Sequence, residues 1–214
     1  MKFLLTSAGF TNKSIADALK KLAGGEIKIA FIPTAANEEE DKSWLQKDLD
    51  NCRKLGEVDV VDISVLEKSI WLEKLKWASV ILVGGGDTTY LMKWVIKSGL
   101  TEELPKLLKK RVYVGISAGS IILSKSIQAS SEYLFSLYGD EVKNPPSGLG
   151  LINFDIRPHL NSSCFPKVNE KYLTKVFKNI DEDLYAIDDN SAVVFDDGKI
   201  EVVSEGKWIK YTKD

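Results

Sequence analysis

The chain has 214 residues and a net charge of −2, with 29 Lys and Arg against 31 Asp and Glu. Its hydrophobic content of 44% is ordinary for a globular protein, and we expect residues 1–214 to form a single domain. A slightly acidic chain, with a pI of about 5.6, argues against nucleic acid or an anionic membrane as the main partner.

The two cysteines, Cys52 and Cys164, are too few for a disulfide framework, so free thiols are expected. The apolar run Phe3-Leu4-Leu5 is too short for a secretory signal, and no segment approaches the ~18 apolar residues of a membrane span. These observations predict a cytoplasmic protein. One histidine and two distant cysteines make a metal site improbable, and no cofactor is expected.

Strands and helices alternate through the first half of the chain. Apolar runs predict strands at 3–5, 27–33, 58–63, 79–83 and 112–114, and amphipathic or charged segments predict helices at 12–22, 38–55, 69–77, 88–98 and 102–110. This alternation predicts a doubly wound α/β sandwich with a mostly parallel sheet. Ligands of such sheets bind at the carboxyl ends of the strands, which is where Gly84, Gly85, Gly86 and Ser117 fall.

The second half of the chain is less regular. Residues 124–150 are polar, rich in serine and contain Pro145-Pro146, which predicts a long loop with a lid role. Strands are expected at 149–156 and 184–187, with a helix at 168–177 between them. Three short strands at 192–195, 200–203 and 208–211 are predicted to finish the sheet as an antiparallel meander.

The segment Gly115-Ile116-Ser117-Ala118-Gly119 matches the Gly-x-Ser-x-Gly nucleophile elbow. A sharp strand-to-helix turn strains the central residue, and glycines two positions before and after it remove the collisions of side chains. Ser117 would stand at the end of a strand, over a helix N-terminus that favours developing negative charge. Because ordinary strand-to-helix turns also produce this pattern, the motif alone does not establish a nucleophile.

His159 is the only histidine, so it is the only imidazole that could activate Ser117. A lone histidine is more often structural, but this one follows a predicted strand end and a proline. The acid that would orient it is Asp188 or Asp189, which end the next strand, and Glu132 and Asp140 in the long loop are weaker candidates.

The triple glycine has two interpretations. It is a plain tight turn, or it is a wall of the site in which a glycine amide joins the amide of Ala118 to bind an oxyanion. Each such donor contributes about 3 kcal/mol of barrier lowering when well placed. No Lys-Ser or Lys-Thr follows the glycines, which excludes a P-loop.

Taken together, these residues resemble the peptidase E (aspartyl dipeptidase) and cyanophycinase family of serine peptidases. The resemblance covers nearly the whole chain and rests on the ordered motifs Val83-Gly84-Gly85-Gly86-Asp87-Thr88, Gly115-Ile116-Ser117-Ala118-Gly119-Ser120, Pro158-His159 and Ile187-Asp188-Asp189. It implies an α/β sandwich similar to the class I glutamine amidotransferase domain. It also implies Ser117 as nucleophile, His159 as general base, and the amides of Gly86 and Ala118 as the oxyanion hole.

The chain departs from the family pattern at three points. Asp189 stands where the family usually has Glu, and Asp87 stands where it usually has Asn, from which it could pair with a substrate amine. The arginine that family members place after the histidine, to hold an aspartyl side chain, has no clear match, and only Lys167 and Lys171 lie nearby.

The resulting hypothesis is a serine peptidase that hydrolyses short peptides in the manner of a dipeptidase, acting as a monomer or homodimer. Ser117, His159 and Asp189 form the expected triad, while Gly85, Asp87 and Glu132 are expected to line the substrate pocket. The alternative is a non-catalytic small-molecule or protein-binding module on the same scaffold. A glutamine amidase is disfavoured because such elbows carry Cys where this chain has Ser117.

Overall fold

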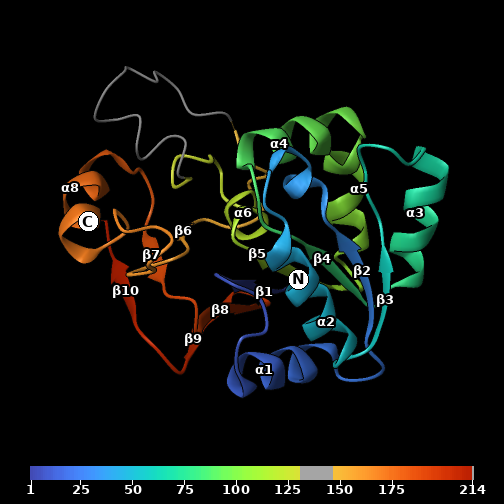
Figure 1. Ribbon diagram of the computed structural model, residues 1–214, viewed down its shortest axis with the longest axis horizontal. Helices are drawn as coiled ribbons and strands as arrows, with labels where there is room; N and C mark the ends of the chain where they lie inside the picture. The colour runs from blue at the N-terminus through green and yellow to red at the C-terminus, as the bar shows by residue number, and fades with distance from the viewer. Residues whose placement is uncertain (131–146, 214) are drawn as a thin grey trace.

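The computed structural model describes residues 1–130 and 147–213. A seven-stranded sheet with the order β3-β2-β4-β5-β1-β8-β9 runs through the molecule (Figure 1). Its strands are β1 (Lys2–Thr6), β2 (Lys28–Ile32), β3 (Glu57–Val60), β4 (Val80–Val83), β5 (Val112–Ile116), β8 (Ser191–Asp196) and β9 (Lys199–Ser204). The first five are mutually parallel, whereas β8 and β9 are antiparallel to their neighbours. The predicted mostly parallel α/β fold is confirmed.

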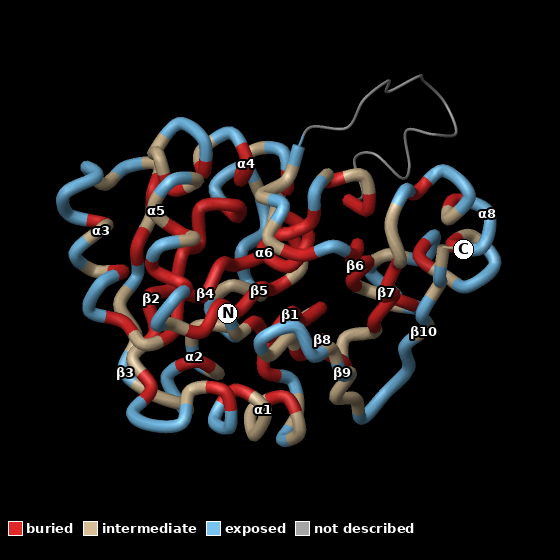
Figure 2. The backbone as a smooth tube through the Cα atoms, turned by 180° about the vertical axis from the view of Figure 1, so that it is seen from behind, coloured by how far each residue is buried: buried red, intermediate tan, exposed pale blue. Residues whose placement is uncertain are grey.

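Helices cover both faces of this sheet, as Figure 1 shows. On one face lie α1 (Lys13–Ala23) and α2 (Ser43–Arg53), and on the other lie α3 (Lys68–Trp77), α4 (Thr88–Lys97) and α5 (Leu100–Leu107). The central strands β4 and β5 are therefore buried on both faces and read as continuous apolar runs (Figure 2). Their carboxyl ends provide a rigid edge for the loops that follow.

A smaller sheet with the order β10-β7-β6 lies beside the first. It contains β6 (Asp155–Arg157), β7 (Leu184–Ile187) and β10 (Trp208–Tyr211), and α8 (Glu170–Val176) packs against it through a separate apolar cluster. The strands β6 and β7 are parallel, so their carboxyl ends lie together. The loops that follow these two strands reach the turn after β5 that holds Ser117.

The predicted meander is correct for two strands and wrong for the third. Instead of following β9, β10 pairs with β7 in the smaller sheet. The turn before it explains the change, because the Lys207 amide donates to Asp188 Oδ2 at 2.5 Å and the Glu205 amide donates to the Asn190 carbonyl at 3.0 Å. These bonds fasten the turn to the end of β7 and direct the chain along it.

Other boundaries are tighter than expected. A 3₁₀ helix (Thr34–Glu38) precedes α2, and the elbow helix α6 is a single turn (Ala118–Ile121). Of the strand expected at 149–156, only β6 forms. Ser126 and Ser147 pair as an isolated bridge, so the two ends of the long predicted loop lie together, and the lid prediction falls largely outside the described residues. Within the described part of the chain, no helix has the length and apolarity that crossing a membrane requires.

Candidate active site

Ser117 occupies the strained turn that the sequence predicted. Its φ of 49° and ψ of −109° place it in a region that non-glycine residues rarely adopt. Its amide is held by the carbonyl of Thr6 on the neighbouring strand, at 3.1 Å. A Cβ at Gly119 would lie 2.1 Å from the Val83 carbonyl oxygen, and one at Gly115 would lie 2.6 Å from the backbone of Ser120. Both elbow positions therefore require glycine.

The turn points Ser117 at the side chains that follow the two parallel strands of the smaller sheet. His159 follows β6, and its Nε2 lies 2.9 Å from Ser117 Oγ. Asp189 follows β7, and its Oδ1 lies 2.7 Å from His159 Nδ1. One continuous chain of hydrogen bonds thus joins the serine, the imidazole and the carboxylate, and its members come from two sheets.

The electrostatics of the site fix the tautomer of the ring. Burial opposes ionisation of the Asp189 carboxyl, but hydrogen bonds from His159 and Ser7 outweigh it and lower its pKa to about 2. An ionised carboxylate only accepts hydrogen bonds, so the proton of the neutral imidazole lies on Nδ1. Nε2 is then left with a lone pair directed at Ser117, which is the arrangement that a general base needs.

Two contacts on His159 were not foreseen from the sequence. Phe165 stacks on the imidazole, with ring centroids 4.3 Å apart and planes 15° apart. Ser7, which follows β1, is fully buried and lies within hydrogen-bonding distance of both His159 and Asp189. The position of Ser7 at a strand end next to the elbow strand was the available signal. Nothing in the pattern around Phe165 pointed to the ring.

The glycine loop after β4 lies directly beside the nucleophile. A Cβ at Gly85 would lie 3.2 Å from the Ser117 Cβ and 3.9 Å from Cζ3 of Trp44 on α2. Trp44 therefore borders the site, although nothing in the sequence pattern placed it there. Gly86 has a φ of 128°, and a Cβ there would lie 2.2 Å from the Ala35 carbonyl oxygen. Within the described residues the Gly86 amide donates no hydrogen bond. Ala118 begins α6, where an amide has no partner inside its own helix.

The other residues that the sequence suggested for the site have different positions in the structure. Asp188 accepts hydrogen bonds from the amides of Asn190 and Lys207 and so shapes the turn, whereas the carboxylate of Asp189 contacts the His159 ring. Asp87 accepts the Tyr90 amide at 2.6 Å and caps α4, which occupies one carboxylate oxygen. Glu132 and Asp140 lie outside the described residues.

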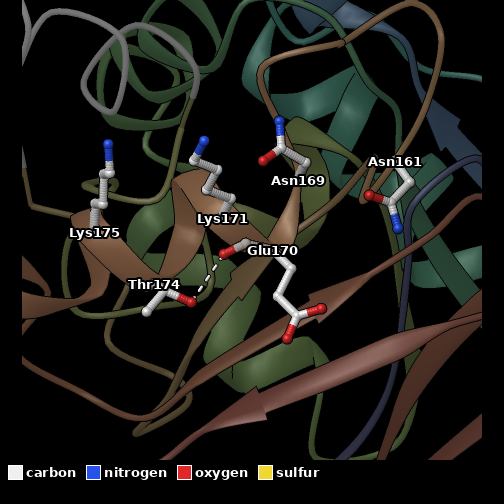
Figure 3. A pocket seen from close by; sticks show the side chains of 6 residues that line it. All are labelled: Asn161, Asn169, Glu170, Lys171, Thr174 and Lys175. Carbon is white, nitrogen blue, oxygen red and sulfur yellow. Dashed lines mark hydrogen bonds between the residues drawn. The ribbon is translucent and has the colours of Figure 1, made fainter.

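A depression lined by polar and charged residues lies on α8 and the loop after His159 (Figure 3). Its lining residues are Asn161, Asn169, Glu170, Lys171, Thr174 and Lys175. The Thr174 hydroxyl is already committed to the Glu170 carbonyl at 2.9 Å. Lys171, one of the two lysines near the position of the unmatched arginine, is among the residues that line this depression.

The side chains that converge beside Ser117 indicate the chemistry of which the site is capable. Among residues 1–130 and 147–213, no three His, Cys, Asp or Glu side chains converge as metal ligands. The groups that do converge are a hydroxyl, an imidazole and a carboxylate, beside backbone amides of a glycine loop. This set suits acyl transfer by nucleophilic catalysis.

Solved structures resemble this fold over nearly its whole length. A crystal structure of a Listeria monocytogenes protein assigned to peptidase E superposes with a TM-score of 0.77 and 22% identity, covering 96% of this chain and 98% of that one. A peptidase from an acI-B1 Actinobacterium superposes with a TM-score of 0.72 and 23% identity, covering 99% and 93%. At these identities the likeness concerns the fold.

Sequence relatives carry the assignment further. An uncharacterized peptidase of Pasteurella multocida is 25% identical over 198 residues, which is 91% of this chain and 93% of that protein. Peptidase E of a Nostoc species is 30% identical over 156 residues, which is 71% of this chain and 60% of that protein. Residues 3–203 match the family described as Peptidase family S51. The resemblance to peptidase E is thereby confirmed, and the chain is a peptidase that belongs to peptidase family S51.

Proposed function

We propose that this protein is a serine-type peptidase that hydrolyses short peptides with Ser117 as nucleophile, His159 as general base and Asp189 as the acid that orients the ring. The observation that carries the proposal is the unbroken hydrogen-bonded chain from Ser117 Oγ through the imidazole to Asp189 Oδ1, at 2.9 and 2.7 Å. A serine that faces an unprotonated ring nitrogen can lose its proton as it attacks.

In the first half of the reaction, Ser117 Oγ forms a bond to the carbonyl carbon of the peptide while its proton passes to His159 Nε2. The electron pair of the carbonyl double bond moves to the oxygen, where the amides of Gly86 and Ala118 would receive the negative charge. The carbon–nitrogen bond then breaks, and the leaving amine takes the proton from Nε2. Asp189 stays ionised throughout and stabilises the imidazolium.

In the second half, water replaces the amine. His159 Nε2 takes a proton from the water as it attacks the acyl carbon, and returns that proton to Ser117 Oγ as the ester bond breaks. The products are the carboxylic acid and the regenerated enzyme. Every proton is accounted for by one imidazole, which fits the only histidine of the chain.

The short substrate is proposed from the relatives, which include peptidase E of Nostoc and a probable alpha-aspartyl dipeptidase of Drosophila melanogaster, the latter 33% identical over 91 residues. The test is hydrolysis of a dipeptide library that includes Asp-X members, by the native protein and by Ser117→Ala. We expect kcat/KM in the variant to fall by about 10⁴-fold or more for each substrate cleaved. Equal turnover by both proteins would refute the proposal.

Labelling with a fluorophosphonate separates catalysis from mere binding. An activated serine reacts with this probe and an ordinary one does not, so Ser117 should be modified in the native protein, as peptide mass spectrometry would show. If the probe leaves Ser117 unmodified and no dipeptide is cleaved, the chain would instead be the non-catalytic module that the sequence left open.

A further inference from the structure

Ser7 has a hydrogen-bonding pattern that the triad alone does not explain. Its Oγ donates to Asp189 Oδ1 at 2.6 Å and accepts the backbone amide of His159 at 2.8 Å. The same oxygen lies 3.2 Å from His159 Nδ1. Ser7 is fully buried, so these contacts are shielded from bulk solvent. One hydroxyl therefore touches the backbone of the base, its ring and the acid.

The direction of each bond follows from the available hydrogens. A serine hydroxyl has one hydrogen, and Asp189 can only accept, so that hydrogen lies on the Ser7–Asp189 bond. The amide of His159 is a donor and can only be met by a lone pair of Ser7 Oγ. Two donors, Ser7 Oγ–H and His159 Nδ1–H, thus converge on Asp189 Oδ1. Such charge-assisted bonds are about twice as strong as neutral ones.

The backbone of His159 also needs support. Its φ of 66° lies in the left-handed region, which is unfavourable for a residue that carries a side chain. The next amide, that of Leu160, is held by the Ile187 carbonyl at 3.0 Å. With Ser7 holding the amide of His159 itself, the strained residue is fixed on both sides.

We propose that Ser7 is a positioning residue of the active site, which holds the His159 ring and the Asp189 carboxylate in one fixed geometry from the end of β1. Ser7 is anchored by the strand that neighbours the elbow strand β5, whereas His159 and Asp189 come from the smaller sheet. Its hydroxyl therefore links the two halves of the triad across the junction between the sheets. The inference rests on the proposed peptidase function but predicts an effect that can be measured without it.

The measurement uses the fact that His159 is the only histidine. Protein labelled with ¹⁵N-histidine gives the NMR signals of this one ring, including the exchange of its Nδ1 proton with water. We compare native protein with Ser7→Ala and Ser7→Cys, because Cys keeps nearly the volume of Ser but is a weak donor and acceptor. Ser124→Ala is the matched control, since Ser124 is equally buried and its hydroxyl bonds to the Phe154 carbonyl, away from the ring.

In both Ser7 variants we expect the Nδ1 proton to exchange with water at least about 10-fold faster. The kcat for peptide hydrolysis should fall about 10- to 100-fold with KM within about twofold, since small misplacement of a catalytic group has costs of this size. Ser124→Ala should match the native protein in both. Native-like exchange in folded Ser7→Cys would overturn the inference, because packing alone would then account for Ser7. If Ser117→Ala shows that no peptide is cleaved, the proton-exchange comparison still decides the role of Ser7.

Discussion

Two adjacent aspartates follow β7, and they have different surroundings. Asp189 meets the imidazole and has its pKa lowered to about 2, against the effect of burial, by the bonds from His159 and Ser7. Asp188 accepts two backbone amides and the Ser191 hydroxyl. Because both residues are aspartates, the same substitution at each position tests which of them is the acid of the proposed triad.

Asp189→Asn should abolish most activity at every pH from 5 to 9. An amide that turns its NH₂ toward Nδ1 favours the wrong tautomer of His159, whose Nε2 then carries a proton and cannot accept one from Ser117. We expect kcat/KM to fall by about 10³- to 10⁴-fold. Asp188→Asn is the control: it should lower the melting temperature, because the Lys207 amide loses a carboxylate acceptor, but keep turnover per folded molecule within about tenfold. Equal losses in the two variants would contradict the assignment.

At the scale of secondary-structure elements, α2 shows where sequence reasoning ends. The sequence predicted a charged helix here, and several of its polar residues are exposed. The inner face, however, places Trp44 beside Gly85 and Asp48 beside Gly9, four residues apart on one side of the helix. The periodicity of the sequence predicts which side of the helix faces the protein. It does not predict which residues that side contacts, because these contacts depend on how the loops after β1 and β4 are folded.

The partly buried carboxyl of Asp48 makes stability depend on pH. Burial raises the pKa of Asp48 to about 7, with Lys47 acting weakly in the opposite direction. In the unfolded chain this carboxyl loses its proton near pH 4, so between about pH 4 and 7 the unfolded state releases a proton that the folded state keeps. The contribution of Asp48 to the free energy of unfolding is therefore present at low pH and is lost as pH rises through 7.

Asp48→Asn removes this dependence. When the pH rises from 4 to 8, the free energy of unfolding of the variant should change by about 2 kcal/mol in its favour relative to the native protein. This value is roughly half of what the full pKa shift of Asp48 implies, because the carboxyl is partly exposed. Urea unfolding at the two pH values measures this difference. Asp50→Asn, on the exposed face beside Arg53, should stay within about 0.5 kcal/mol of the native protein at both. A native-like pH dependence in Asp48→Asn would show that the carboxyl is ionised in the folded protein.

For the whole molecule, the sequence predicted the mostly parallel α/β architecture and named the three side chains that lie together beside the Ser117 turn, because strand ends and glycine spacing are local signals. The sequence did not predict that β10 pairs with β7. This pairing depends on a hydrogen bond from the Lys207 amide to the side chain of Asp188, 19 residues away. Ser7 was missed for a related reason: it contacts His159 and Asp189, which follow strands of the other sheet. Contacts between distant segments are what the local pattern omits.

The residues of the proposed triad are divided between two sheets, which has a consequence for unfolding. Ser117 follows β5 of the large sheet, whereas His159 and Asp189 follow strands of the smaller sheet. Part of the smaller sheet packs on an apolar cluster of its own around Leu173 and Leu184, although Ile156 and Ile187 belong to the core of the large sheet. Polar bonds from the loop after β1 help to join the two sheets, among them Thr11 Oγ1 to the Asp189 carbonyl at 2.7 Å. A protein built in this way can lose the geometry of the site before it loses the large sheet.

Leu173→Ala tests this separation. Leu173 is fully buried in the smaller cluster, so its truncation should cost about 2–5 kcal/mol, concentrated in α8 and the smaller sheet. The rate of Ser117 labelling by a fluorophosphonate should then fall at a temperature several degrees below the loss of the far-ultraviolet circular dichroism signal. Leu19→Ala makes the same change in the cluster between α1 and the large sheet, and there the two transitions should coincide. Coincident transitions in Leu173→Ala as well would mean that the two sheets unfold as one cooperative unit.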